Sequence, residues 1–212
     1  MKKLALIGSK DFAEQIQGFA EQTGEYVVVG FFDDFEPKGT IIRSLPVFGK
    51  ICDIENVYKL GSFDCLFLAA GYNNFSFRDK VFSELSGKVP FANIISKSAK
   101  IADDVKLGEG IYIGAGSIID RRTVIGNNVF IHGGTTIGHD NVIGAHTYIS
   151  GRFNTAGFTN IGERCFFGIC SCVSDHITIC DDVWIGLACV VIKNIKEPGK
   201  YMSPAAKLYK IE

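Results

Sequence analysis

A histidine and an aspartate stand next to each other in the segment TTIGHDNVIGAH (residues 135–146), at positions 139 and 140. A neutral histidine is a suitable general base near pH 7, and a carboxylate beside it can hold the imidazole in one orientation. His139 and Asp140 are therefore candidates for a proton-transfer step. What they can do depends on the elements that position them and on the groups that lie opposite.

The two residues lie in a repeat of six. Apolar residues recur at every sixth position from Ile95 to Val191, and sixteen of these seventeen positions are apolar, with Thr155 the one exception. Glycine often follows the apolar residue, and a small or β-branched residue often stands two positions before it. A period of six is typical of a hexapeptide β-helix, in which each hexad supplies a short strand and a turn. Three hexads make one coil, so the repeat predicts five to six coils of eighteen residues.

The coil length of eighteen residues predicts which residue lies above His139. Ile137 points into the prism and Gly138 starts the turn, so His139 and Asp140 face outward at a corner. Gly157 follows His139 by eighteen residues, and we expect its backbone one coil above the imidazole. A free N–H at that position can stabilise an oxyanion. A base and an oxyanion donor suffice for direct acyl transfer to an amine or a hydroxyl, and no cysteine has a base beside it to act as a nucleophile.

The first 90 residues follow a different pattern. Short apolar runs at 3–8, 26–34 and 64–70 predict strands, and the amphipathic stretches 11–23 and 77–86 predict helices. Alternation of strands and helices predicts a parallel sheet with helices on its faces, a Rossmann-like α/β domain. We therefore expect an α/β domain over 1–90, a parallel β-helix over 91–198 and a tail over 199–212.

Composition excludes several classes of protein. The chain has 212 residues and a formal net charge of −1, so a nucleic-acid backbone is not the expected partner. Its seven cysteines contain no CxxC pair, which favours reduced thiols in the cytoplasm. The apolar run near the N-terminus is too short for a signal peptide, and no run approaches the length of a membrane span. We expect a cytoplasmic protein without membrane insertion.

Several motifs resemble a known family. The segments GHDNVIG (138–144), IGERCFFGICSCV (161–173), WIGLACVVIK (184–193) and YMSPAAKL (201–208) are similar to those of left-handed β-helix acyltransferases. More narrowly, they resemble the bacterial nucleotide-sugar N-acetyltransferases and their sialic-acid O-acetyltransferase relatives. GFFDD (30–34) and AAGYNNFSFR (69–78) resemble segments of the Rossmann-like half of that family. The resemblance spans nearly the whole chain.

The resemblance implies a role for each part. His139 would be the base on the sugar amine, helped by Asp140, and the Gly157 amide would hold the thioester oxyanion. Acetyl-CoA would lie between two prisms of a homotrimer, near Gly168, Ile169, Gly186, Leu187, Ser203, Pro204 and Ala205. The nucleotide sugar would rest on the N-terminal half, near Gly8, Lys10, Asp33, Asp34, Asn73 and Arg78.

Two positions depart from the family pattern. The first loop of the family is rich in glycine, whereas here it runs from Gly8 to Phe12 through Ser9, Lys10 and Asp11. A glycine-rich loop lets the backbone approach the pyrophosphate closely, and the bulkier loop here does not. The charge of Lys10 can bind the pyrophosphate instead. Many members carry a second histidine nine residues after the catalytic one, and here Tyr148 stands at that position.

The resemblance thus predicts N-acetylation of a nucleotide-linked amino sugar, a 4-amino-4,6-dideoxy-hexose of a surface glycan, by acetyl-CoA. The nearest alternative is O-acetylation of a sialic-acid type of sugar, because both reactions use the same base and oxyanion donor. A non-catalytic prism that binds nucleotide sugars is a third possibility, in which His139 is a solvated turn residue. Solvated surface is the expectation for His132, His146 and His176.

A metalloenzyme is a further alternative, since some left-handed prisms are zinc-dependent carbonic anhydrases. Those enzymes resemble one another in having two histidine ligands five residues apart. No two of the four histidines in this chain have that spacing. We therefore expect no metal.

Overall fold

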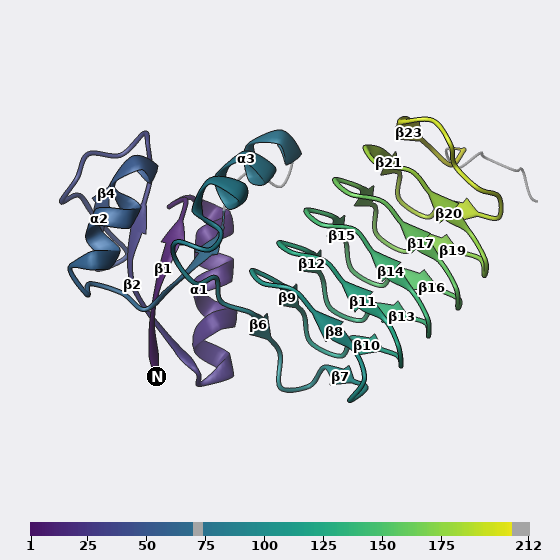
Figure 1. Ribbon diagram of the computed structural model, residues 1–212, viewed down its shortest axis with the longest axis horizontal. Helices are drawn as coiled ribbons and strands as arrows, with labels where there is room; N and C mark the ends of the chain where they lie inside the picture. Colours follow the sequence, from purple (N-terminus) through teal and green to yellow (C-terminus); the bar gives the residue numbers. More distant parts are fainter. Residues whose placement is uncertain (70–73, 205–212) are drawn as a thin grey trace, which may run out of the picture.

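The computed structural model describes residues 1–69 and 74–204, and these form two parts (Figure 1). An α/β domain, purple to blue in the figure, is built from the first 85 residues. A prism of stacked coils, teal to yellow, follows it and runs away from the domain. The predicted fold class is confirmed, and the two predicted patterns, strand–helix alternation and a period of six, correspond to the two parts.

The N-terminal domain has one five-stranded sheet in the order β3-β4-β2-β1-β5. Its strands are β1 (Lys2–Ile7), β2 (Tyr26–Phe32), β3 (Ile41–Ile42), β4 (Leu45–Gly49) and β5 (Cys65–Leu68). All neighbouring pairs are parallel except β3 and β4, which form an antiparallel hairpin that the sequence pattern did not predict. The helices are α1 (Asp11–Thr23), α2 (Ile54–Lys59) and α3 (Phe75–Leu85), with a short 3-10 turn η1 (Ile51–Asp53) before α2.

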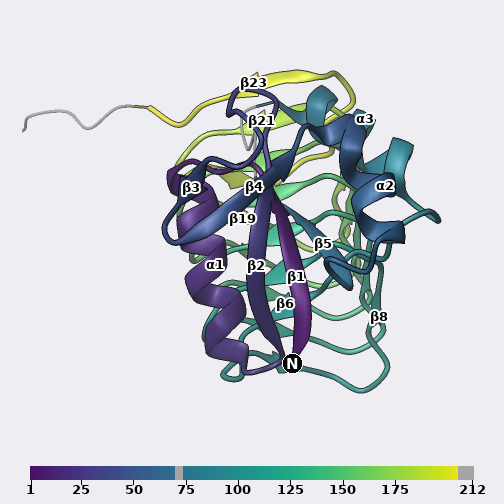
Figure 2. The same cartoon turned by 90° about the vertical axis from the view of Figure 1, so that its left-hand side faces the viewer.

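Helices cover both faces of this sheet. In β1, Leu4 and Leu6 belong to the core under α1, whereas Ala5 and Ile7 belong to the core under α2 and α3. Successive side chains of a strand point to opposite faces, so one apolar run serves two cores. Figure 2 shows α1 on one side of β1 and β2, and α2 and α3 on the other.

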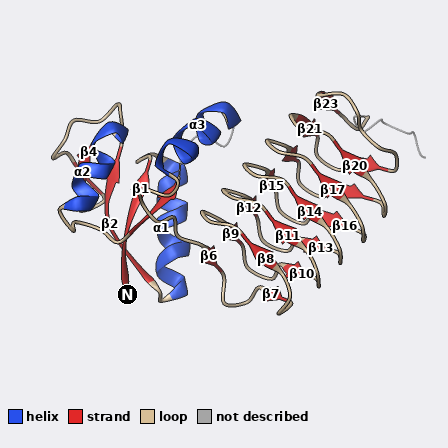
Figure 3. Cartoon of the chain, viewed as in Figure 1, coloured by secondary structure: helices blue, strands red, loops and turns tan. Residues whose placement is uncertain are grey.

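The prism has three parallel sheets, drawn in red in Figure 3. Sheet 1 contains β6 (Ile94–Ile95), β9 (Tyr112–Ile113), β12 (Phe130–Ile131), β15 (Tyr148–Ile149), β18 (Phe166–Phe167), β21 (Val183–Ile185) and β23 (Gly199–Tyr201). Sheet 2 contains β7 (Lys100–Ile101), β10 (Ile118–Ile119), β13 (Thr136–Ile137), β16 (Asn154–Thr155), β19 (Cys172–Val173) and β22 (Val190–Val191). Sheet 3 contains β8 (Lys106–Leu107), β11 (Val124–Ile125), β14 (Val142–Ile143), β17 (Asn160–Ile161) and β20 (Thr178–Ile179).

The coils have the predicted length. Ile119 pairs with Ile137, and Ile137 pairs with Thr155, so each strand lies beside the strand eighteen residues later. The repeated apolar side chains fill the prism and are almost all buried. The small residues two positions earlier are also buried where they carry hydroxyls. Most of these hydroxyls donate to turn carbonyls of the next coil, as Thr123 Oγ1 does to Gly138 O (2.9 Å), whereas Ser171 Oγ donates to Gly168 O of its own turn (2.7 Å). The segment predicted as a tail opens with β23, which pairs with β21 in sheet 1.

An aromatic ladder on the outer face of sheet 1 receives the N-terminal domain. Tyr112, Phe130 and Tyr148 stack on one another in successive coils, with ring centroids 4.3 and 5.1 Å apart. Phe12 and Phe19 of α1 pack on this ladder, with centroids 5.2 Å from Phe130 and 5.0 Å from Tyr112, respectively. The core on the α1 side of the domain is therefore continuous with the prism, and this contact fixes the domain on the coils.

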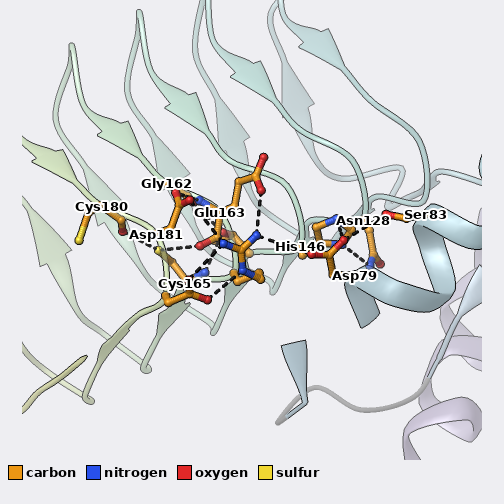
Figure 4. A network of polar contacts seen from close by, with 12 residues as sticks. Asp79, Ser83, Asn128, His146, Gly162, Glu163, Cys165, Cys180 and Asp181 are labelled. Atoms are coloured by element: carbon orange, nitrogen blue, oxygen red, sulfur yellow. Dashed lines mark hydrogen bonds and ion pairs between the residues drawn. The ribbon is translucent and has the colours of Figure 1, made fainter. Parts of the chain in front are cut away.

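A polar network holds α3 against another corner of the prism (Figure 4). His146 is buried, bonds Asn128 Nδ2 through Nδ1 (3.0 Å) and lies 3.4 Å from a carboxylate oxygen of Asp79. Burial is the main cause of the lowered pKa of His146, and the nearby Asp79 carboxylate acts in the opposite direction by raising that pKa. Arg164 joins the same carboxylate to the acidic residues of the next coils. The expectation that His146 is a solvated turn residue was wrong, because α3 covers its corner.

Among the described helices, none is long and apolar enough to cross a membrane.

Candidate active site

His139 and Asp140 form a hydrogen-bonded pair at the corner between sheets 2 and 3. His139 Nδ1 lies 2.7 Å from Asp140 Oδ2. Because an ionised carboxylate only accepts, Nδ1 carries the proton and Nε2 has a free lone pair. Side chains of neighbours in an extended loop usually diverge, but Asp140 adopts a left-handed backbone (φ 58°), which turns its carboxylate back toward the imidazole. The His139 side chain is 44% exposed, so Nε2 is accessible to a substrate.

Arg122 holds the other side of the same carboxylate. Its Nε donates to Asp140 Oδ1 (2.6 Å) and its Nη2 to Oδ2 (2.7 Å), a bidentate pair. These bonds, and then the one from His139, keep the pKa of Asp140 well below its usual range. The sequence contained a signal for this residue, since Arg122 precedes Asp140 by one coil of eighteen residues.

Replacing Arg122 with alanine is expected to lower kcat/KM by about tenfold or more, because the Asp140 carboxylate then loses the two bonds that fix it and holds the imidazole less firmly in one orientation. The rate is measured by mass spectrometry of the product. Arg122→Lys keeps the charge but not the two parallel bonds, and it should recover only part of the rate. An unchanged rate in Arg122→Ala contradicts a positioning role for Arg122.

Gly157 lies directly against the imidazole, one coil above it as the spacing predicted. A Cβ at this position would lie 2.6 Å from His139 Cε1 and 2.8 Å from Nε2, closer than real side-chain contacts allow. Glycine is therefore required here for close approach of the ring to the backbone. Among the described residues the Gly157 N–H meets no acceptor, so it is available to a ligand beside Nε2.

The break in the repeat at Thr155 has a structural reason. Thr155 Oγ1 accepts from the Gly138 N–H (3.1 Å) and from Asn141 Nδ2 (2.6 Å), which ties the two turns around His139 together. Asn141 Oδ1 accepts in turn from the Thr159 N–H (2.5 Å). An aliphatic side chain at position 155 would leave the Gly138 N–H without its acceptor, at a cost of about 1–3 kcal/mol, and would remove one of the three acceptors of Asn141 Nδ2. The exception in the sequence thus stabilises the corner of the candidate site.

The predicted acetyl-CoA residues lie at a different edge of sheet 2. Gly168, Ile169, Gly186 and Leu187 follow strands of sheet 1, so they occupy the corner between sheets 1 and 2. Ile169 and Leu187 are 58% and 67% exposed. Gly168 lies against the backbone of the next coil, since a Cβ on it would lie 2.5 Å from Leu187 N, whereas Gly186 lies against a side chain, since a Cβ on it would lie 2.8 Å from Met202 Sδ. Within one chain, these residues and His139 are on opposite edges of sheet 2.

A groove of about 690 Å³ opens beside the last coils, and its walls include Val190, Ile192 and Met202. Ser203 and Pro204 also line it, and Ser203 Oγ donates to Leu187 O (2.9 Å). Ala205 was predicted with them and lies outside the described residues. Of the described residues predicted for acetyl-CoA, Ser203 and Pro204 thus line this groove, and Leu187 contacts Ser203 at the exposed corner.

The structure brings together most residues predicted to bind the nucleotide. Gly8 has a left-handed backbone (φ 101°) at the end of β1. The Ser9 hydroxyl donates to Asp33 Oδ2 (2.6 Å), and the Ile51 amide donates to Asp34 Oδ1 (2.9 Å). These loops follow the carboxyl ends of β1 and β2, where open α/β sheets bind ligands. Asn73 was predicted here and lies outside the described residues.

Lys10 and Arg43, two cations near the loop from Gly8 to Phe12, make contacts that the sequence did not predict. Lys10 is not an isolated point charge, because its Nζ pairs with Glu36 (2.5 Å), a contact that raises the pKa of the lysine. Arg43 instead donates from Nη2 to Ser9 O (3.1 Å) and lies over the Phe31 ring. Arg43 was missed because it comes from the β3–β4 hairpin, for which the sequence offered no periodic signal.

Arg78 was predicted as a substrate contact, and the structure places it in the interior. Its side chain is 1% exposed, with Nη1 donating to Leu68 O (3.4 Å) and Nη2 to Asn128 Oδ1 (2.5 Å). Burial lowers the pKa of this guanidinium to about 10. In this position Arg78 links α3 to the prism, and direct contact with a substrate is not favoured by the placement.

The other predicted surface histidines divide into two kinds. His132 is half-buried and shares a hydrogen bond from Nε2 with the Tyr148 hydroxyl (2.5 Å), and burial lowers its pKa. Tyr148 is therefore part of the aromatic ladder, bonded to a histidine that the sequence analysis had placed in solvent. His176 is exposed, as expected, and stacks on Phe158. In the described parts of the chain, no group of three His, Cys, Asp or Glu side chains is placed to hold a metal ion.

Known proteins share both parts of this chain. The PglD N-terminal domain family matches residues 3–85. A perosamine N-acetyltransferase from Caulobacter crescentus, solved as a mutant with CoA and GDP-perosamine, is 24% identical, with a TM-score of 0.84 over 99% of this chain and 98% of that chain. The acetyltransferase domain of PglB from Neisseria gonorrhoeae FA1090, in complex with acetyl coenzyme A, is 23% identical, with a TM-score of 0.84 over 98% and 99% of the two chains. At these identities the likeness shows a shared fold.

A UDP-3-O-acylglucosamine N-acyltransferase from Herminiimonas arsenicoxydans is 39% identical over 122 residues, which are 57% of this chain and 33% of that protein. The match thus spans about a third of the length of this curated relative. Taken with the two structural likenesses and the geometry of the prism, these matches confirm the predicted family resemblance. Residues 3–85 match the PglD N-terminal domain family, and the chain has the fold of solved nucleotide-sugar N-acetyltransferases of the hexapeptide left-handed β-helix class.

Proposed function

We propose that this protein transfers the acetyl group of acetyl-CoA to the amine of a nucleotide-linked amino sugar, a 4-amino-4,6-dideoxy-hexose of a surface glycan. The observation that carries the proposal is the corner at His139. There an imidazole oriented by Asp140 and Arg122 turns an open Nε2 toward a backbone N–H of Gly157 that has no acceptor among the described residues. The likeness to a perosamine N-acetyltransferase and to an acetyl-CoA-bound acetyltransferase domain supports the same chemistry.

The reaction needs one base and one oxyanion donor. The sugar amine attacks the thioester carbonyl, and His139 Nε2 accepts the proton that the nitrogen loses as the C–N bond forms. The carbonyl oxygen becomes an oxyanion, which the Gly157 N–H stabilises. The C–S bond then breaks, and the CoA thiolate takes the proton from the imidazolium. Asp140 holds Nδ1–H throughout, so the ring keeps its orientation in both protonation states.

We further propose that the protein works as a homotrimer. His139 and the residues proposed for acetyl-CoA, among them Leu187 and Ile169, lie on opposite edges of sheet 2 in one chain. A second prism packed alongside brings one copy's edge next to the other edge of its neighbour. Exposed β-branched side chains on the outer faces of sheets 2 and 3, such as Ile118 and Val142, give this surface the apolar character of a contact between subunits.

All seven cysteines are free thiols, which supports a cytoplasmic location.

The proposed function is tested by mass-spectrometric detection of product. The protein is incubated with acetyl-CoA and a panel of UDP-, GDP- and dTDP-linked 4-amino-4,6-dideoxy sugars. We expect one member of the panel to gain an acetyl group on nitrogen. Mass spectrometry is preferred to thiol-release dyes because exposed cysteines such as Cys52 and Cys170 react with those dyes.

The same panel includes hydroxyl acceptors of the sialic-acid type. Acetylation of these and not of the amines would replace the N-acetyl assignment by O-acetylation with the same base. Binding of a nucleotide sugar without any acetyl transfer would instead support a binding module and contradict the proposal.

A further inference from the structure

Phe158 occupies a position that the fold does not favour for it. The hexad turns of the prism place one residue after another in the left-handed backbone region, and Phe158 (φ 57°) is the only large apolar side chain among the described non-glycine residues there. A bulky residue is strained in this conformation, whereas asparagine or glycine tolerates it. The side chain is also 50% exposed, so burial does not compensate for the strain. Such outliers occur most often at functional sites.

The ring of Phe158 is fixed beside the candidate base. It stacks on His176 of the next coil, with centroids 4.8 Å apart and planes 7° from parallel. It stands perpendicular to the His139 ring at 5.2 Å, and its backbone N–H donates to His139 O (3.1 Å). A rigid apolar wall therefore stands beside the His139 ring, on the same corner as the Gly157 N–H.

This wall differs from its surroundings in chemistry. The other groups at the corner are polar: Asp140, Arg122 and Asp175 carry charge, and Gly157 offers a backbone donor. An acceptor sugar bound with its amine at His139 Nε2 must lay part of its ring or a ring substituent on the Phe158 face. An aromatic face contacts C–H groups and a methyl group well, but it offers no partner to a hydroxyl that loses its water there.

We propose that Phe158 is a specificity-determining residue that contacts the apolar edge of the acceptor sugar and selects a 6-deoxy sugar over its 6-hydroxy counterpart. This inference rests on the proposed function. An apolar contact of this kind discriminates between a methyl and a hydroxymethyl group by about 10- to 10²-fold.

The test compares two nucleotide-linked 4-amino sugars that differ only in a methyl or a hydroxymethyl group at C6. The wild type should favour the 6-deoxy sugar in kcat/KM by about tenfold or more. In Phe158→Asn, a residue that accepts the left-handed backbone, this ratio should fall close to one through a loss on the 6-deoxy sugar. Phe158→Leu should retain part of the preference. A ratio that is near one in the wild type, or unchanged in Phe158→Asn, overturns the proposal.

Two controls separate this role from others. Asp182→Asn introduces the same residue at a left-handed turn (φ 59°) on the corner between sheets 3 and 1, away from both proposed binding sites, and should leave both rates unchanged. An equal loss on both sugars in Phe158→Asn, with a shifted acid limb of the pH profile, would assign Phe158 to orienting His139 and refute selection. If the wild type acetylates no amino sugar, the proposed function itself fails, and this outcome is distinct from an active enzyme with an unchanged ratio.

Discussion

Replacing His139 with alanine is expected to lower kcat for acetyl transfer by about 10²-fold or more, because the sugar amine then loses its proton without a positioned base. The binding of acetyl-CoA and of the nucleotide sugar should change little, since the imidazole contributes only the Nε2 lone pair at this corner. The rate is measured by mass spectrometry of the product, and binding is measured by calorimetry with each ligand alone.

Added imidazole provides the control for this variant. A small base that diffuses into the space left by the ring should restore part of the rate in His139→Ala and have no effect on the wild type. A melting temperature close to that of the wild type shows that the turn at 138–141 persists, held by Asn141 and Thr155. An alanine variant with nearly normal kcat would show that the corner is not the site of proton transfer.

Gly157→Ala is also expected to lower kcat by about 10²-fold, although the amide proposed to bind the oxyanion stays in place. The backbone at Gly157 does not adopt a left-handed conformation, so alanine is not strained there. Its Cβ, however, would lie 2.6 Å from His139 Cε1, and relief to an ordinary carbon–carbon contact moves the ring by about 1 Å. A displacement of that size can cost about 10²-fold in rate. The measurement is kcat for the substrate found in the panel.

A double-mutant cycle tests the steric cause. If the added methyl acts only through the His139 ring, it should destabilise the wild-type fold but have no further effect on stability or rate in the His139→Ala background. Gly18→Ala is the matched control, because a Cβ on Gly18 meets nothing within 4 Å in α1 and should be neutral or slightly stabilising. A Gly157→Ala variant with full activity would contradict the close packing of the glycine on the imidazole.

Much of the β-helix followed from spacing alone. A strand that pairs with the strand eighteen residues later carries the same side-chain directions from coil to coil, so Ile137 is buried and Gly157 lies above His139. The same rule applied backward places Arg122 under Asp140. In the N-terminal domain three of the five strands (β1, β2 and β5) and the helices α1 and α3 were also predictable, because alternation of apolar runs and amphipathic stretches is a local property of the chain.

Contacts between segments with no fixed separation in the sequence, within the N-terminal domain or between the two parts, were not predictable in this way. His146 stands at a turn position like that of His176, yet α3 buries the first and leaves the second in solvent. Arg43 reaches the Gly8 loop from a hairpin that has no periodic pattern. Lys10 pairs with Glu36 through two loops that only the sheet brings together. Each of these contacts joins segments with no fixed separation in the sequence.

The sequence by itself therefore determined the prism, the burial of its repeated apolar column and the vertical alignment of His139 with Gly157, because a regular repeat converts separation along the chain into position in space. Only the tertiary structure decided what these positions do. The Asp140 carboxylate turned to the imidazole, Arg122 formed two bonds to it from the coil below, and Phe158 was fixed beside them by His176. The left-handed backbone of these turns recurs with the repeat, but the contacts of each turn side chain depend on its rotamer and on packing between coils, and the period sets neither.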